Sequence, residues 1–94
     1  MTNYKSGRYF EYELKKRYEK QGAYVIRSAG SHGLADLIVI YRDKKPLLVQ
    51  VKFFSGSVPK PSQEFRNLKA SGFRKIWIAK RKWKHGSQFE YEVE

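Results

Sequence analysis

The sequence contains no cysteine and only two histidines. Disulfide bonds and cysteine-ligated zinc are therefore excluded, and two histidines alone do not complete a usual structural zinc site. No stretch approaches the roughly 18 consecutive apolar residues of a membrane span, and the N-terminus lacks the apolar core of a secretory signal. We therefore expect an intracellular, cytoplasmic protein, encoded by a cell or by a virus.

Acidic residues are also scarce. Twenty lysines and arginines stand against nine aspartates and glutamates, so the formal net charge is +11. Between Lys60 and His85 the only acid is Glu64. A large positive charge favours the binding of a polyanion and makes that association fast and salt-sensitive, so nucleic acid is the expected partner. The alternative is charge that only keeps the chain soluble. A membrane surface is disfavoured because no basic segment carries a long apolar face.

The chain is short, at 94 residues. A chain of this length buries only roughly 60 to 65% of its unfolded surface and supports one hydrophobic core, so we expect one domain over residues 1–94. Two tryptophans, seven tyrosines and six phenylalanines are a large aromatic content for that core. Marginal stability of the monomer and surplus aromatic surface favour a dimer.

Hydrophobic periodicity predicts the elements. A helix is expected over residues 6–21, with Phe10, Leu14, Tyr18 and Gln21 on one face. A second, short helix is expected between a Ser62 cap and Gly72. Strands are expected over residues 23–28, 37–41, 47–52, 76–79 and 89–94. The result is an α/β domain of order αβββαββ with a mixed central sheet flanked by helices.

Two details of this prediction concern coverage and mobility. Residues 37–41 are apolar on both faces, which is typical of a strand covered on both sides. Residues 53–61 contain one glycine and two prolines and are expected to form a mobile loop, with potential as interface material.

Polar side chains on the second and third predicted strands suggest chemistry. Asp36 begins an apolar strand, where an ionised carboxylate is costly unless it reaches water, a cation or a metal. Gln50 and Lys52 are two residues apart and project to one face of the next strand. A hairpin at 42–46 would place Asp36 beside them. Such a set can hold a hard divalent cation and position a water for attack on phosphate. The alternative is that Asp36 caps a turn and pairs with Lys52.

These residues stand in segments that resemble the archaeal-type Holliday-junction resolvases of the PD-(D/E)xK nuclease superfamily. Residues 7–14 resemble the family's opening helix, in which a glycine precedes the catalytic glutamate by four residues, and this places that role on Glu11. Residues 27–31 resemble its arginine, serine and glycine loop. Residues 35–38 resemble the segment of the metal-binding aspartate, and 49–52 (V-Q-V-K) stand where the family has E-V-K. The match covers roughly residues 5–53.

The resemblance implies a restriction-endonuclease-like fold and a Mg²⁺-dependent or Mn²⁺-dependent endonuclease that resolves four-way DNA junctions in recombination and repair. The implied metal ligands are Glu11, Asp36, Gln50 and the Val51 carbonyl, and the implied catalytic residues are Glu11, Asp36, Gln50 and Lys52. Symmetric cutting of two strands of like polarity implies a homodimer.

Helix geometry gives separate support for Glu11, which lies about 60° from the centre of the apolar arc, whereas Glu13 lies about 100° away on the other flank. The alternative for Glu11 is a surface acid that pairs with Lys15 one turn away.

Two positions depart from the family pattern. Ala35 replaces a proline that does no chemistry. Gln50 replaces a carboxylate and removes one negative charge, so the affinity for Mg²⁺ should fall. Some restriction-endonuclease branches resemble this chain in using glutamine here and remain active. A catalytically weakened or inactive DNA-binding module and a less selective structure-specific nuclease are therefore the alternative functions.

Five residues are candidates for DNA contact. Hydroxyl, guanidinium and loop groups can hold phosphates without reading bases. Trp83 lies among basic residues and is favoured for stacking on bases, whereas Trp77 is expected in the core. For the four candidates other than Trp83, the alternative is solvated surface. The candidates are Arg8, Arg27, Ser31, His32 and Trp83.

Overall fold

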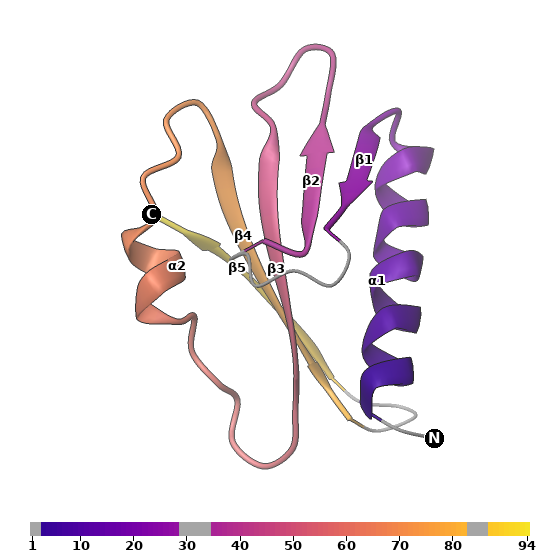
Figure 1. The fold of residues 1–94 in the computed structure, drawn as a ribbon, viewed down its shortest axis with the longest axis vertical. Coiled ribbons are helices and arrows are strands. Elements are labelled where there is room, and N and C mark those ends of the chain that lie inside the picture. The colour runs from indigo at the N-terminus through magenta and orange to yellow at the C-terminus, as the bar shows by residue number, and fades with distance from the viewer. Residues whose placement is uncertain (1–2, 29–34, 83–86) are drawn as a thin grey trace.

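Two helices and five strands follow one another in the described part of this computed structural model (Figure 1). It describes residues 3–28, 35–82 and 87–94, with side chains from Tyr9 onward. The α/β class with a mixed sheet and two helices is confirmed. In chain order the elements are α1 (Asn3–Lys20), β1 (Tyr24–Arg27), β2 (Leu37–Ile40), β3 (Leu47–Phe54), α2 (Gln63–Asn67), β4 (Arg74–Arg81) and β5 (Gln88–Val93).

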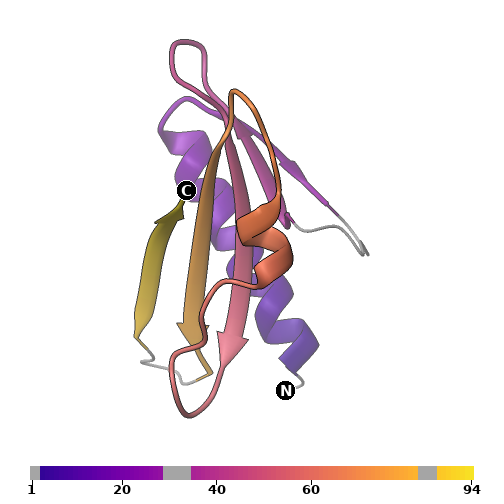
Figure 2. The same ribbon diagram turned by 90° about the vertical axis from the view of Figure 1, so that its left-hand side faces the viewer.

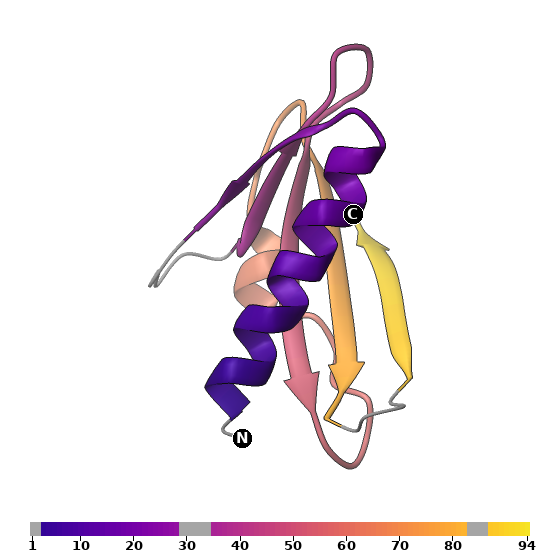
Figure 3. The same ribbon diagram turned by 90° about the vertical axis from the view of Figure 1, so that its right-hand side faces the viewer.

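The five strands form one sheet in the order β1-β2-β3-β4-β5. Neighbouring strands are antiparallel except β3 and β4, which are parallel. A parallel pair needs a crossover, and the segment that contains α2 supplies it. The helices lie on opposite faces of the sheet (Figure 2), and α1 runs across β1, β2 and β3 (Figure 3).

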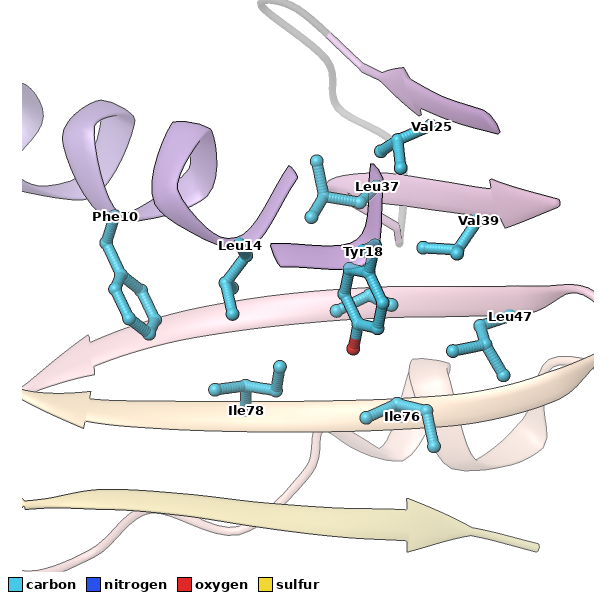
Figure 4. Packing of buried hydrophobic residues seen from close by; sticks show 10 residues of the cluster. Phe10, Leu14, Tyr18, Val25, Leu37, Val39, Leu47, Ile76 and Ile78 are labelled. Carbon is cyan, nitrogen blue, oxygen red and sulfur yellow. The ribbon is translucent and has the colours of Figure 1, made fainter. Parts of the chain in front are cut away.

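The larger core lies between α1 and the sheet (Figure 4). Phe10, Leu14 and Tyr18 are four residues apart, so their side chains form one stripe on the helix, and all three are buried as expected. Gln21 follows the end of the helix and is exposed, where its Oε1 accepts a hydrogen bond from the Tyr41 hydroxyl at 3.1 Å. On the sheet the buried partners are Val25, Leu37, Val39, Leu47, Val49, Ile76 and Ile78.

A smaller core lies on the other face, under α2. Its buried members are Phe54, Phe65, Trp77 and Ala79. Ser62 caps α2 as expected, since its Oγ accepts a hydrogen bond from the Phe65 N–H at 3.1 Å. This places Phe65 against the sheet, and the expected core position of Trp77, with 1% of its surface exposed, is confirmed.

The second helix is shorter than predicted. It ends at Asn67, with Leu68 as its C-cap, and does not continue to Gly72. A buried lysine explains the difference: Lys75 Nζ donates to the carbonyls of Phe65, Arg66 and Leu68 at 2.7 to 3.1 Å. The Phe65 carbonyl also accepts the Leu68 N–H at 3.4 Å, and a cation is favourable beside the carbonyls at the end of a helix.

The predicted loop over 53–61 is wrong at its start, because β3 continues through Phe54. Both added residues have aromatic partners. The Phe53 ring meets that of Phe10 edge-on at 5.5 Å, and the Phe54 ring lies 6.2 Å from that of Phe89. Packing on both faces therefore extends the strand beyond its polar residues.

The expected coverage of β2 on both sides is also wrong. Leu37 and Val39 are fully buried under α1, but Ile40 is 41% exposed on the opposite face. On the neighbouring strand, Tyr24 and Ile26 are 67% and 41% exposed. The buried partners of α2 come from β3 and β4, so β1 and β2 keep an exposed apolar surface. We call Tyr24, Ile26 and Ile40 the open sheet face.

No helix in the described part of the chain is long and apolar enough to cross a membrane.

Candidate functional site

Asp36 lies directly before the first paired residue of β2, where the pairing of β2 with β3 ends. Its backbone N–H donates to the Val49 carbonyl at 2.7 Å, and its carbonyl accepts from the Ser28 N–H at 2.9 Å. Its side-chain Oδ2 accepts the Val51 N–H at 2.7 Å. The carboxylate therefore replaces a backbone partner where the ladder ends, and Asp36 lies beside the Gln50 to Lys52 segment as predicted.

The predicted alternation along β3 is confirmed as well. Val49 is buried in the core under α1, and Val51 packs against that core. Gln50 and Lys52 alternate with them and therefore project to the opposite face. Gln50 is half-buried, whereas Lys52 is exposed.

Burial raises the pKa of the Asp36 carboxyl above its ordinary value. The hydrogen bond from Val51 and the positive charges of Lys52 and Arg27 act in the opposite direction but do not cancel the burial. An ionised Asp36 therefore lacks part of the solvation that it would have in water. A cation that binds at this carboxylate would restore favourable interactions, which is a property of metal-binding carboxylates.

Gln50 has a buried amide oxygen without a hydrogen-bond partner within the described residues. Its register partner on β4 is Trp77, whose buried indole Nε1 also lacks a partner there. A buried acceptor and a buried donor thus project from adjacent strands to the same face. Leaving either unsatisfied costs about 1 to 3 kcal/mol, so both atoms favour a bound group, a water or each other.

Glu11 reaches the end of β1. Its Oε1 accepts a hydrogen bond from Arg27 Nε at 3.1 Å, and less than a fifth of either side chain is exposed. Arg27 also lies over the Tyr12 ring, 4.9 Å from its centre. Lys15, the alternative partner considered for Glu11, forms an ion pair with Glu19, with 3.2 Å between its Nζ and the Glu19 carboxylate. Glu11 is half-buried and Glu13 exposed, in agreement with their predicted positions on the helix.

The predicted DNA-contact residues are only partly described. Arg27 is half-buried against Glu11 and Tyr12, so its side chain holds α1 to β1 as well as facing the Asp36 charge. The backbone of Arg8 lies in α1, but its side chain falls outside the described residues. Ser31, His32 and Trp83 lie outside them altogether.

Oxygen atoms where the pairing of β2 with β3 ends are of the kind that a hard divalent cation binds. A carboxylate has about four lone-pair sites, so Asp36 can accept from Val51 and still bind a cation. The N–H and carbonyl of a strand residue point to the same neighbouring strand, so the Val51 carbonyl faces the side of Asp36. The unsatisfied Oε1 of Gln50 adds a neutral oxygen. Mg²⁺ takes such ligands together with waters and substrate phosphates.

The charge of this set is low. The described residues contain no cluster of three or more histidine, cysteine, aspartate or glutamate side chains that could hold a metal. Asp36 is the one carboxylate of the strand set, and Glu11 is engaged with Arg27. Metal affinity at this set would therefore depend on a further anionic ligand.

The structure adds two contacts that the sequence did not predict. One is the hydrogen bond that the Val51 N–H donates to the Asp36 carboxylate. The sequence predicts a role for Val51 only through its carbonyl. The other is the neighbouring pair of Gln50 and Trp77. The first had a signal, since the ionised carboxylate of Asp36 at the start of an apolar strand needs a polar partner. The second had none, because the register of a parallel pair across a long crossover leaves no mark in local sequence.

Comparisons with protein-family models, curated proteins and solved structures found no match for this chain.

Proposed function

We propose that this protein is a divalent-metal-dependent endonuclease with a restriction-endonuclease-like fold that cuts four-way DNA junctions as a homodimer. The observation that carries the proposal is the Asp36 carboxylate. Its pKa is raised, and it accepts a hydrogen bond from Val51, the residue of β3 between Gln50 and Lys52. The net charge of +11 supports a polyanionic substrate.

The reaction is phosphodiester hydrolysis. A water oxygen forms a bond to phosphorus, the bond from phosphorus to one ester oxygen breaks, and that oxygen takes a proton. The bound Mg²⁺ or Mn²⁺ would supply Lewis-acid stabilisation of the phosphate charge. Asp36, Gln50 and the Val51 carbonyl would hold the cation. Glu11 would join them by giving up its hydrogen bond with Arg27.

Lys52 would interact with the attacking water and with the phosphate. It is exposed on the same face as Gln50, and its charge acts on Asp36. Its ammonium can donate hydrogen bonds to the attacking water and to a phosphate oxygen, and so orient the first and neutralise charge on the second.

The homodimer has support from the open sheet face. Tyr24, Ile26 and Ile40 are exposed, apolar and uncharged on a strongly basic chain. Exposed apolar patches mark interaction sites, and an uncharged patch allows two equally charged copies to approach.

The low charge of the site favours one other function, a DNA-binding module that keeps the fold and lacks catalysis. Four-way junctions labelled in turn on each strand and incubated with Mg²⁺ test the proposal. Paired nicks at symmetric positions support junction resolution. Scattered nicks on several substrates indicate a less selective nuclease, and binding without cleavage indicates the module.

A further inference from the structure

A second site lies on the α2 side of the sheet, beyond Trp77. A pocket of about 810 Å³ opens between the segment before α2, the helix itself and the end of β5. Figure 2 views the molecule from this side, with α2 in front of the sheet and β5 at its edge. The residues that matter for its chemistry are Pro59, Lys60, Arg66, Tyr91, Glu92 and Glu94. None of them belongs to the site around Asp36.

Tyr91 gives the pocket an aromatic surface. Its ring lies 5.8 Å from that of its register partner Trp77, at an interplanar angle of 38°. Trp77 is 1% exposed, so Tyr91 packs on a fixed support, yet 44% of Tyr91 remains exposed. An aromatic ring held in this way is a platform on which a nucleic-acid base can stack.

The cations of the pocket suit a phosphate. Lys60 and Arg66 are both exposed. Arg66 uses its Nε to donate to the Pro61 carbonyl at 3.2 Å, which orients the guanidinium, and the group has further N–H donors.

The acids of the pocket do not cancel this charge. Glu92 accepts two hydrogen bonds from Arg74, at 2.8 and 2.6 Å, and its charge is thereby balanced. Glu94 remains as an acceptor, which is a group suited to the amino group of a base such as cytosine.

We propose that this pocket binds one unpaired nucleotide of DNA, with the base against Tyr91 and the phosphate at Lys60 and Arg66. The volume is in the range of about 300 to 1,000 Å³ that holds a ligand of nucleotide size. A base inside a duplex keeps its faces covered by its neighbours, so only an unpaired base can stack on Tyr91. The identification of the ligand as DNA rests on the proposed function.

The pocket and the Asp36 site can act on one strand of DNA. Tyr91 is on β5, Asp36 precedes β2, and three strand spacings of about 4.8 Å separate them, or roughly 14 Å. Base pairs at a branch point open more easily than those within a continuous duplex, so the pocket would favour branched over continuous duplex DNA.

Fluorescence anisotropy with a short labelled oligodeoxythymidine and a matched blunt duplex tests this. Tyr91→Leu should weaken binding of the single strand about tenfold and leave the duplex within about twofold. Tyr91→Phe keeps the ring and should bind like the parent. Arg66→Gln, a surface change that leaves Trp77 untouched, should weaken single-strand binding several-fold and reduce its salt dependence. Tyr9→Leu, at an exposed tyrosine of α1 outside both the pocket and the open sheet face, is the matched control.

Three results would overturn the pocket: unchanged single-strand affinity in both Tyr91→Leu and Arg66→Gln, an equal loss for duplex, or an equal loss in Tyr9→Leu. Cleavage of junctions separates this inference from the proposed function. If the parent cuts nothing but Tyr91→Leu loses single-strand affinity selectively, the nuclease fails and the pocket stands. If the parent cuts and the variants bind oligodeoxythymidine normally, the pocket fails and the nuclease stands.

Discussion

The Asp36 carboxylate accepts the backbone N–H of Val51 at 2.7 Å, and Val51 is the residue between Gln50 and Lys52. One hydrogen bond therefore fixes the distance between the acid and the two polar side chains of β3. It also means that truncating Asp36 removes a structural contact together with a charge. Asparagine keeps an acceptor oxygen and removes only the charge.

We predict that Asp36→Asn and Lys52→Met each lower single-turnover cleavage of a four-way junction at least a hundredfold. Affinity for the junction should stay within a few-fold, because many phosphate contacts dominate binding. Lys82→Met, which removes an exposed charge just after β4, is the control for Lys52→Met. Parent-like cleavage by either site variant would remove its residue from the catalytic centre.

Asp36→Asn should also stabilise the metal-free protein at neutral pH. Burial raises the pKa of Asp36 in the folded state above its unfolded value of 3.8, so ionisation costs folding free energy. That cost is absent below the unfolded pKa and complete above the folded pKa. Urea unfolding in a chelator should show Asp36→Asn above the parent at pH 7, with the difference closing as the pH falls below the unfolded pKa. A parent more stable than the variant at pH 7 would contradict the assigned direction.

The sequence predicts the parts of this arrangement that depend on local periodicity. Alternation along β3 separates Gln50 and Lys52 from the core, and a hairpin of few residues leaves little choice about where Asp36 meets them. The spacing of Phe10, Leu14 and Tyr18 likewise predicts the buried side of α1. In each case the partners are close in sequence, so the pattern itself contains the geometry.

Contacts across the crossover were not predictable in this way. The register that places Trp77 beside Gln50 depends on how far the chain travels between β3 and β4. The early end of α2 depends on Lys75, which lies outside the helix and looks like one more surface cation in the sequence. The fundamental reason is that tertiary partners decide these features and local propensity does not.

The pair of Glu11 and Arg27 should stabilise the fold through direct coupling. Its groups are more buried than the exposed pair of Lys15 and Glu19, so its attraction is less screened. A double-mutant cycle of Glu11→Gln and Arg27→Gln should give a coupling free energy of about 1 kcal/mol, against a few tenths for the Lys15 and Glu19 cycle. Equal values in the two cycles would show that burial adds nothing here.

The open sheet face should carry the dimer contact. Sedimentation of the parent at micromolar concentration should give a dimer, and Ile40→Lys should give a monomer, since a buried unpaired lysine is costly. Phe73→Lys is the matched control, because Phe73 is 40% exposed and Ile40 is 41% exposed. A parent that stays monomeric even when bound to a junction would exclude paired cutting by two copies. A dimer unaffected by Ile40→Lys would place the contact elsewhere.

The last prediction concerns Gln50→Glu, whose effect should change sign with the metal. Without a cation, a second carboxylate beside Asp36 repels it and is itself partly buried, so the free energy of unfolding in a chelator should fall. With Mg²⁺, the added negative ligand favours a hard cation, and the half-saturating concentration for cleavage should drop about tenfold, or about 1.4 kcal/mol. Mg²⁺ should therefore raise the unfolding midpoint of the variant more than that of the parent. Gln50→Leu, which has no ligand oxygen, should lose both responses. If Gln50→Glu and the parent show the same Mg²⁺ dependence in cleavage and in unfolding, Gln50 does not contact the cation, and its buried oxygen serves Trp77 instead.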